Sequence, residues 1–391
     1  KLGKLAGLEK IELQQEADEL KAEVERLNTL FLNENAQQAE LRARLGALVK
    51  KYGDARRTEI VYASEEFNPE DFYADDEMII TISHLGYIKR TPLAEYKAQN
   101  RGGMGSKGSA SRDEDFIEHI YPASMHSTMM FFTQKGRCYW LKVYEIPEGS
   151  KTSKGRAIQN LLNIESDDAV TAFIRVKQLQ DPEYNMNHYL LFCTKDGIIK
   201  KTRLEAYSRP RQNGVNAITI RENDSVIQVL LTDGTNEVLL ANRNGRAIRF
   251  NESKVREMGR TATGVRGMLL DEDGQDEVVG MIVVNPQEPD NVMVVSENGY
   301  GKRSELEDYR VTNRGGKGVK TLKITEKTGK LVAILKVNDD NDLMIINKSG
   351  ITIRFDASSL RVMGRATQGV RLINLEKRGE EIASVCVVEH D

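Results

Sequence analysis

Cationic side chains recur at fixed distances from a repeated glycine along most of this chain. The repeated glycines stand in equivalent turns and define six units: Gly86, Gly136, Gly197, Gly245, Gly299 and Gly350. The residues four positions after them are Arg90, Trp140, Lys201, Arg249, Arg303 and Arg354, so all but one are cations. Fifteen positions after the glycines come Arg101, Lys151, Arg260, Arg314 and Arg365, with Arg209 and Arg211 near the matching place in the third unit. Ammonium and guanidinium groups bind phosphate oxygens, so this spacing indicates anion binding.

Residues at one phase of a rotational repeat lie on one wall of the assembled ring. These cations, with the neighbouring Lys89, Lys200 and Lys302, therefore predict a belt of positive charge. A belt on a curved wall suits the phosphate backbone of a nucleic acid, which it contacts without reading the bases. For any one of these cations a solvated strand end is the alternative, but their recurrence favours a binding surface. The compensating acids are expected elsewhere, for example at the heads of the strands that accompany each unit.

Two glycine-rich loops strengthen this interpretation. One runs from Gln99 through Arg101, Gly102, Gly103 and Gly105 to Lys107, and the fifth unit has a near duplicate from Asn313 through Lys317 to Gly318. Backbone N–H groups in such loops can approach an anion closely. Neither loop has the G-x-x-x-x-G-K-[ST] order of a nucleotide-binding loop, and a tight surface turn is the alternative for each.

Composition excludes several other classes of protein. The chain has 391 residues, with 56 basic against 59 acidic side chains, an average that by itself argues against a nucleic-acid binder. Cys138, Cys193 and Cys386 have no disulfide or zinc spacing, and no apolar run is long enough for a membrane helix. We therefore expect a reduced, cytoplasmic protein with no metal site and no membrane association.

The elements that position the cations form the repeat itself. Each unit has an apolar strand, a turn that ends in glycine, a second strand and a companion strand. A second glycine follows 19 residues after the first in five units (Gly105, Gly155, Gly264, Gly318 and Gly369) and 17 after it, at Gly214, in the third. Six such units predict one mainly-β, six-bladed propeller-like ring. The sequence leaves open whether a blade is four consecutive strands or exchanges one with its neighbour.

The first sixty residues are different, because they are free of proline and rich in helix-forming residues. Leucine-rich a/d spacing predicts helices over 8–32 and 36–52, interrupted at Asn33, each with an apolar stripe that needs a partner. Basic and acidic residues balance there, eleven against eleven, which suggests no charged ligand. We expect a helical segment over 1–60, a linker over 61–75 and the ring over 76–391, together forming a piece of a longer protein.

The segment 99–105 resembles the Q-R-R-G-G-K-G box of the C-terminal domain of the DNA gyrase A subunit family. KKYGDARRTEI and LAGLEKIELQQEADEL are similar to the end of that family's tower and coiled-coil region, so the resemblance covers essentially the whole chain. Gln99, Arg101, Gly102, Gly103 and Gly105 keep the box pattern, whereas Asn100 and Met104 replace two of its cations.

The resemblance implies a six-bladed β-pinwheel that wraps double-stranded DNA around a basic outer edge. In the family this wrapping lets ATP-dependent strand passage introduce negative supercoils, and the partners are the gyrase B subunit together with a second copy of the A subunit. It places the catalytic tyrosine, ATP and Mg²⁺ on other parts of the enzyme, so no catalytic residue or cofactor is expected here. The alternatives are the C-terminal domain of the topoisomerase IV A subunit, or a propeller that binds an acidic partner protein. Our DNA-binding set is Lys89, Arg90, Gln99, Arg101, Gly102, Gly103, Gly105, Lys107, Lys151, Lys200, Lys201, Arg209, Arg211, Arg249, Arg260, Lys302, Arg303, Arg314, Lys317, Arg354 and Arg365.

Overall fold

The chain divides into two compact parts, Lys1–Asn68 and Pro69–Asp391. The computed structural model describes residues 2–54, 57–58, 69–83, 85–95, 115, 117–150, 153–177, 179–271, 274–288, 290–347, 352–375 and 381–389. The first part is helical and the second is built from strands, as the sequence predicts.

The first part contains helices α1 (Leu2–Leu32) and α2 (Glu34–Tyr52). Asn33 separates them and caps α2, because its side-chain oxygen accepts hydrogen bonds from the backbone N–H groups of Asn35 and Ala36. The a/d stripe is exposed: Leu20, Val24 and Leu27 have 61%, 56% and 51% of their surface accessible. None of the described helices is both long enough and apolar enough to cross a membrane.

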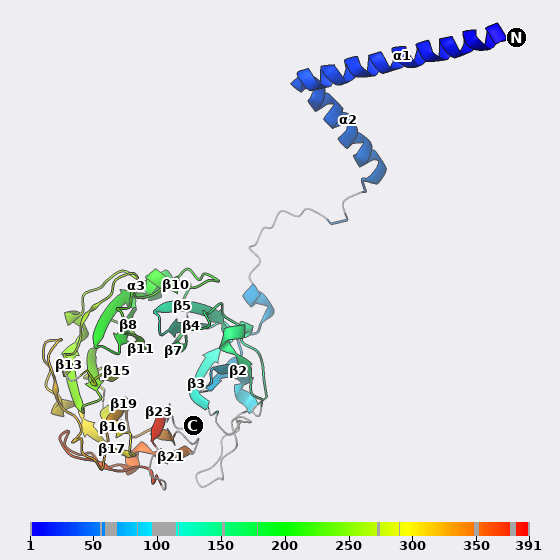
Figure 1. Ribbon diagram of the computed structural model, residues 1–391. Coiled ribbons are helices and arrows are strands. Elements are labelled where there is room, and N and C mark those ends of the chain that lie inside the picture. Colours follow the sequence, from blue (N-terminus) through cyan, green and yellow to red (C-terminus); the bar gives the residue numbers. More distant parts are fainter. Residues whose placement is uncertain are drawn as a thin grey trace. The chain divides into compact units, whose positions relative to one another are not determined.

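The second part is a ring of six antiparallel sheets around a central axis (Figure 1). Each blade is centred on a two-stranded hairpin. The blades are numbered by the sequence unit that supplies this hairpin. The first hairpin strands are β1 (Glu77–Ser83), β4 (Thr128–Thr133), β8 (Tyr189–Thr194), β12 (Glu237–Asn242), β16 (Asn291–Ser296) and β20 (Asn341–Asn347). The second hairpin strands are β2 (Tyr87–Pro92), β5 (Arg137–Lys142), β9 (Ile198–Arg203), β13 (Arg246–Asn251), β17 (Tyr300–Glu305) and β21 (Thr352–Asp356).

The companion strands line the centre of the ring, where Figure 1 shows them innermost. They are β3 (Ile117–Ser124), β7 (Val170–Val176), β11 (Val226–Thr232), β15 (Val278–Val284), β19 (Leu331–Val337) and β23 (Ile382–Glu389). Each pairs with the first hairpin strand of its own unit. Acids at the heads of these strands cap the adjacent hairpin turns rather than facing outward: Asp168 accepts from Lys135 N and Asp224 from Asp196 N.

A short fourth strand forms the outer edge of the first five blades, and it comes from the following unit. These strands are β6 (Arg156–Ala157), β10 (Val215–Asn216), β14 (Val265–Arg266), β18 (Val319–Lys320) and β22 (Val370–Arg371). They pair with β2, β5, β9, β13 and β17 respectively, so neighbouring blades exchange a strand. Within the described residues the sixth sheet has three strands.

The second glycine of each unit explains how this outer strand docks. Gly264 immediately precedes β14 and has φ +105°, in the left-handed region that favours glycine. A Cβ placed there would lie 2.7 Å from the carbonyl oxygen of Ile199 in the preceding unit. The backbone therefore approaches β9 more closely than any side chain would allow.

Short turns complete each unit. Apart from η1 (Pro69–Phe72) and η4 (Ile158–Asn160), 3₁₀ turns follow the second hairpin strands: η2 (Leu93–Glu95), η3 (Val143–Glu145), η5 (Leu204–Tyr207), η6 (Glu252–Lys254), η7 (Leu306–Asp308) and η8 (Ala357–Ser359). Helix α3 (Pro182–Asn187) occupies the longer spacing before the third hairpin.

The hydrophobic core lies between adjacent blades. Strand β4 is buried along its whole length, and its alternating side chains enter two different clusters. Met130 and Phe132 pack with Phe192 of the third blade, whereas Phe131 packs with Ile80 of the first. Both faces of β4 are therefore buried against neighbouring blades, which places the residues beside it in contact with the adjacent units.

Residues 69–75, which the sequence analysis assigned to a linker, belong to the ring. Lys142 forms an ion pair with Glu70, and the ring of Tyr73 stacks on Tyr144 with centroids 4.7 Å apart. His126 N also donates to Asp75. The boundary of the ring therefore lies several residues earlier than predicted.

Candidate nucleic-acid interface

The cations four positions after the turn glycines are mostly buried, at 9% exposure for Arg90, 7% for Lys201, 8% for Arg249 and 7% for Arg303. The prediction that these side chains form an exposed belt is wrong, because they lie at the junction with the next blade. Arg354 is the exception, with an exposed side chain whose Nε donates to Asp342 at 2.6 Å.

These buried cations bind the 3₁₀ turn or an acid of a neighbouring segment. Arg249 Nη1 donates to the carbonyl oxygens of Leu306 at 2.7 Å and Tyr309 at 3.0 Å, both in the fifth unit. Its Nε donates to Glu237 at 2.6 Å. Arg90 Nη1 makes the equivalent bonds to Tyr144 and Ile146, which connects the first blade to the second unit.

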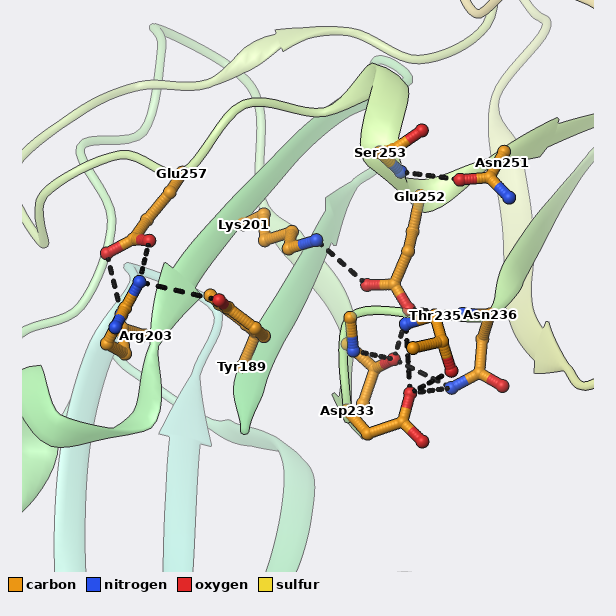
Figure 2. Close-up of polar contacts among 12 residues, drawn as sticks. Tyr189, Lys201, Arg203, Asp233, Thr235, Asn236, Asn251, Glu252, Ser253 and Glu257 are labelled. Atoms are coloured by element: carbon orange, nitrogen blue, oxygen red, sulfur yellow. Dashed lines mark hydrogen bonds and ion pairs between the residues drawn. The ribbon is translucent and has the colours of Figure 1, made fainter. Parts of the chain in front are cut away.

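Lys201 occupies this position in the third blade (Figure 2). Its Nζ lies 3.1 Å from Glu252 Oε2 at the start of η6, and 4.5 Å from the centroid of the Tyr189 ring. Glu252 is fully buried, and its other oxygen accepts from Thr232 Oγ1 and Asn236 N. Nearby, Arg203 pairs with Glu257 at 2.7 Å in a more exposed position. The third and fourth units are therefore joined by charged contacts.

Trp140 replaces the cation in the second unit for a related reason. It is buried in one apolar cluster with Leu179, Leu204 and Tyr207, where its indole N–H has no hydrogen-bond partner among the described residues. At this junction an aromatic ring packs against apolar side chains. At the equivalent junctions a cation forms hydrogen bonds or ion pairs instead.

Lys89, Lys200 and Lys302 are also buried, at 2%, 0% and 0% exposure. Each ammonium group donates to backbone carbonyl oxygens of a loop from the next unit. Burial, with the nearby charge of Arg260 adding to it, lowers the pKa of Lys200 to about 7. Burial likewise lowers the pKa of Lys302 to about 8.

The cations of the loops before the second glycine reach solvent. Arg209, Arg211 and Lys317 are exposed, and Arg260, Arg314 and Arg365 are partly exposed. Arg314 Nη1 donates to the carbonyl oxygen of Arg266 at 2.9 Å, and Arg365 Nη1 makes the same contact with Lys320 at 2.9 Å. These bonds bring cations from successive units together across the blade boundaries.

Seven residues of the predicted set lie outside the described residues: Gln99, Arg101, Gly102, Gly103, Gly105, Lys107 and Lys151. They include the whole glycine-rich box of the first unit, so its contacts stay a prediction.

Two further series of exposed cations were missed by the sequence analysis. One lies eleven residues after the turn glycine, at Arg256, Arg310 and Arg361. The other lies on the short outer strands, at Arg266, Lys320 and Arg371. Both series recur in the fourth to sixth units at a constant distance from the turn glycine. A comparison of every position in the repeat, and not of two positions alone, identifies them. The described residues contain no group of acidic, histidine or cysteine side chains placed to hold a metal ion.

Known proteins share both the sequence and this architecture. Residues 77–124, 127–177, 188–233, 236–285, 290–338 and 341–389 match the family described as DNA gyrase C-terminal domain, beta-propeller. The DNA gyrase A subunit of Staphylococcus aureus (strain N315) is 42% identical over 394 residues, which cover 100% of this chain and 43% of that protein. Its counterpart in strain MRSA252 is also 42% identical, and the match covers 44% of it. The chain therefore spans less than half the length of these relatives.

Two solved structures are similar to the ring. The C-terminal domain of DNA topoisomerase IV superposes with a TM-score of 0.67 and 27% identity, covering 81% of this chain and 94% of that one. The DNA gyrase A C-terminal domain superposes with a TM-score of 0.64 and 26% identity, covering 79% and 99%. With six matched repeats and whole-chain identity to gyrase A, this chain belongs to the DNA gyrase A family, and its ring is the C-terminal β-propeller of that family.

Proposed function

We propose that the ring binds duplex DNA along its outer edge and bends it, largely without sequence specificity. The observation that carries the proposal is the recurrence of exposed and partly exposed cations in successive units at that edge. They are Arg256, Arg260, Arg266, Arg310, Arg314, Lys320, Arg361, Arg365 and Arg371. Because the duplex repeats its phosphates regularly, a regular row of cations contacts it without reading bases.

In the parent enzyme this wrapping presents a DNA segment to the gate with a fixed crossing sense. ATP-dependent strand passage by a gyrase of two A and two B subunits then introduces negative supercoils. The chain contributes binding and bending, while cleavage and ATP hydrolysis, with Mg²⁺, belong to other parts of the assembly. A 40–90° bend over 20–30 bp costs on the order of 1–6 kcal/mol, which phosphate contacts from several blades can offset.

The experiment measures DNA affinity against duplex length and salt concentration. About 8 to 10 phosphate contacts predict a slope of log K against log salt near −7 to −9. Affinity should rise with duplex length until the edge is filled, and nick-ligation of plasmid in the presence of the protein should change its linking number. Length-independent binding with an unchanged linking number would contradict wrapping.

A charge-neutralising triple variant locates the surface. Arg256, Arg310 and Arg361 changed together to Gln should reduce the magnitude of the salt slope by about 3. The matched control changes Arg175, Lys177 and Lys336 to Gln. These residues lie on or beside the inner strands, so their loss should leave the slope unchanged.

The topoisomerase IV type of domain is the second candidate, favoured by the structural similarity of that protein's C-terminal domain. A domain that binds DNA without constraining a wrap gives a steep salt slope and an unchanged linking number. A ring that binds an acidic partner protein instead would show weak DNA binding at every duplex length.

A further inference from the structure

Three buried lysines each donate to backbone carbonyl oxygens of a loop from the next unit. Lys89 Nζ donates to the carbonyl oxygens of Ser150 at 3.0 Å and Ser153 at 2.8 Å. In the sequence, Lys151 of the predicted set stands between these two serines, outside the described residues. The lysines stand three residues after the turn glycine in the first, third and fifth units.

Lys200 makes the corresponding contact in the third blade. Its Nζ lies 2.5 Å from the carbonyl oxygen of Arg260 and 2.5 Å from that of Ala217. The Arg260 guanidinium has no hydrogen-bond or ion-pair partner in the described part of the chain. The region that the guanidinium can reach therefore depends on where the loop backbone lies, and Lys200 Nζ donates to that backbone at the same residue.

Lys302 repeats the arrangement in the fifth blade. Its Nζ donates to the carbonyl oxygens of Gly364, at 2.7 Å, and Arg365, and to Thr367 Oγ1 at 3.2 Å. Three acceptors match the three hydrogens of an ammonium group. Because buried carbonyl groups need donors, the lysine satisfies a loop that turns its carbonyls inward and its cation outward.

The loop of the fifth unit shows the alternative. It contains Arg314, Gly315 and Gly316 and lies against Ile248, which occupies the lysine phase of the fourth unit. Its own backbone makes the holding contacts, with Gly315 N donating to Gly267 O at 2.6 Å and Leu269 N donating to Gly316 O at 3.0 Å. The loops that Lys200 and Lys302 hold, which contain Arg260 and Arg365, lack this glycine pair. In the second unit Tyr139 occupies the lysine phase instead.

We infer that Lys200 and Lys302 are positioning residues of the DNA interface, which fix the loops from which Arg260 and Arg365 reach phosphate. The inference rests on the proposed function, because it assigns the loop arginines to DNA contact. Complete burial excludes a direct contact between either lysine and phosphate in this conformation. The lysines act on DNA only through the backbone of the next unit.

A double-mutant cycle on the 391-residue chain tests this role. Lys302→Met should reduce the magnitude of the salt slope by about 1, the value for one lost phosphate contact, and weaken binding several-fold. Arg365→Gln should do the same, and the double variant should bind no more weakly than either single one, because both changes remove one contact. The cycle of Lys200→Met with Arg260→Gln should behave in the same way.

Two controls separate positioning from a general loss of stability. Val294→Ala removes a buried aliphatic group opposite Lys302 on β16, and should lower the unfolding temperature without changing the salt slope. Lys302→Met combined with Arg211→Gln, in a different loop, should be additive. If Lys302→Met does not fold, Thr367→Val removes one acceptor of the same ammonium group and should give a smaller effect, again non-additive with Arg365→Gln.

The results that overturn the inference are distinct from those that overturn DNA binding. An unchanged slope for Lys302→Met, or full additivity with Arg365→Gln, contradicts the positioning role. Absence of salt-dependent DNA binding by the unmodified chain contradicts the proposed function itself.

Discussion

At the residue scale, a charged side chain in this ring acts according to its burial and not only its phase in the repeat. Lys201 and Arg249 were predicted to face phosphate, yet both lie at blade junctions with oxygen partners. A buried charge is costly to leave unpaired, so these contacts are expected to be essential to folding. Exposed pairs in the same region contribute far less.

Glu252 and Glu257 provide a matched test, because both pair with a cation of β9 (Figure 2). Glu252→Ala leaves the Lys201 ammonium buried without its carboxylate, and should cost about 3–5 kcal/mol of unfolding free energy. Glu257→Ala removes a partly exposed partner of Arg203, and should cost less than about 1 kcal/mol. Urea unfolding followed by circular dichroism measures both, and equal losses would contradict the assignment.

Lys200 predicts a pH dependence of stability. Its pKa is lowered to about 7 in the folded ring, below the value near 10.5 expected in the unfolded chain. Between these values the unfolded state binds more protons, so the unfolding free energy should rise as the pH increases from 7 towards 10. Lys200→Met removes this contribution. The difference in unfolding free energy between the unmodified chain and the variant should therefore shift in favour of the unmodified chain as the pH increases above 7. Urea unfolding at about pH 6, 7, 8 and 9 gives the comparison, and parallel curves would contradict the lowered pKa of Lys200.

At the element scale, the repeat predicted the number of blades but not the exchange of their outer strands. Alternation of apolar residues and turn glycines defines a hairpin, because both signals are local. The outer strands are only two residues long, as in Val265–Arg266, too short for a recognisable alternation. The burial of Lys200 was equally hidden, since it depends on carbonyl groups contributed by the next unit, sixty residues away.

Gly264 tests the docking of an exchanged strand. Gly264→Ala combines a φ of +105° with a Cβ 2.7 Å from the carbonyl oxygen of Ile199, so it should cost on the order of 1–3 kcal/mol. Hydrogen exchange should quicken at Val265 and Ile199, which pair in the ladder between β14 and β9. Gly259→Ala, five residues earlier, meets nothing within 4 Å and should change stability by less than about 0.5 kcal/mol. Similar effects of the two substitutions would rule out close backbone approach as the reason for Gly264.

At the scale of the whole molecule, net charge is a poor guide to DNA binding. The chain carries 56 basic and 59 acidic residues, yet acids such as Asp168 and Asp224 cap hairpin turns while basic residues of successive units meet at blade boundaries. The helical residues 1–60 balance eleven basic against eleven acidic residues. The proposed interface is therefore contained in the ring alone.

Residues 69–391 expressed by themselves test this division. They form a compact part with their own core, so they should unfold cooperatively at the same urea midpoint as the ring of the full chain. Their DNA salt slope should equal that of the full chain, because the removed residues carry eleven basic against thirteen acidic side chains and so no excess of positive charge. The full chain exposes the apolar stripe of Leu20, Val24 and Leu27, so its sedimentation should show concentration-dependent association that residues 69–391 lack. A shallower slope for residues 69–391 would place part of the DNA interface on the helices.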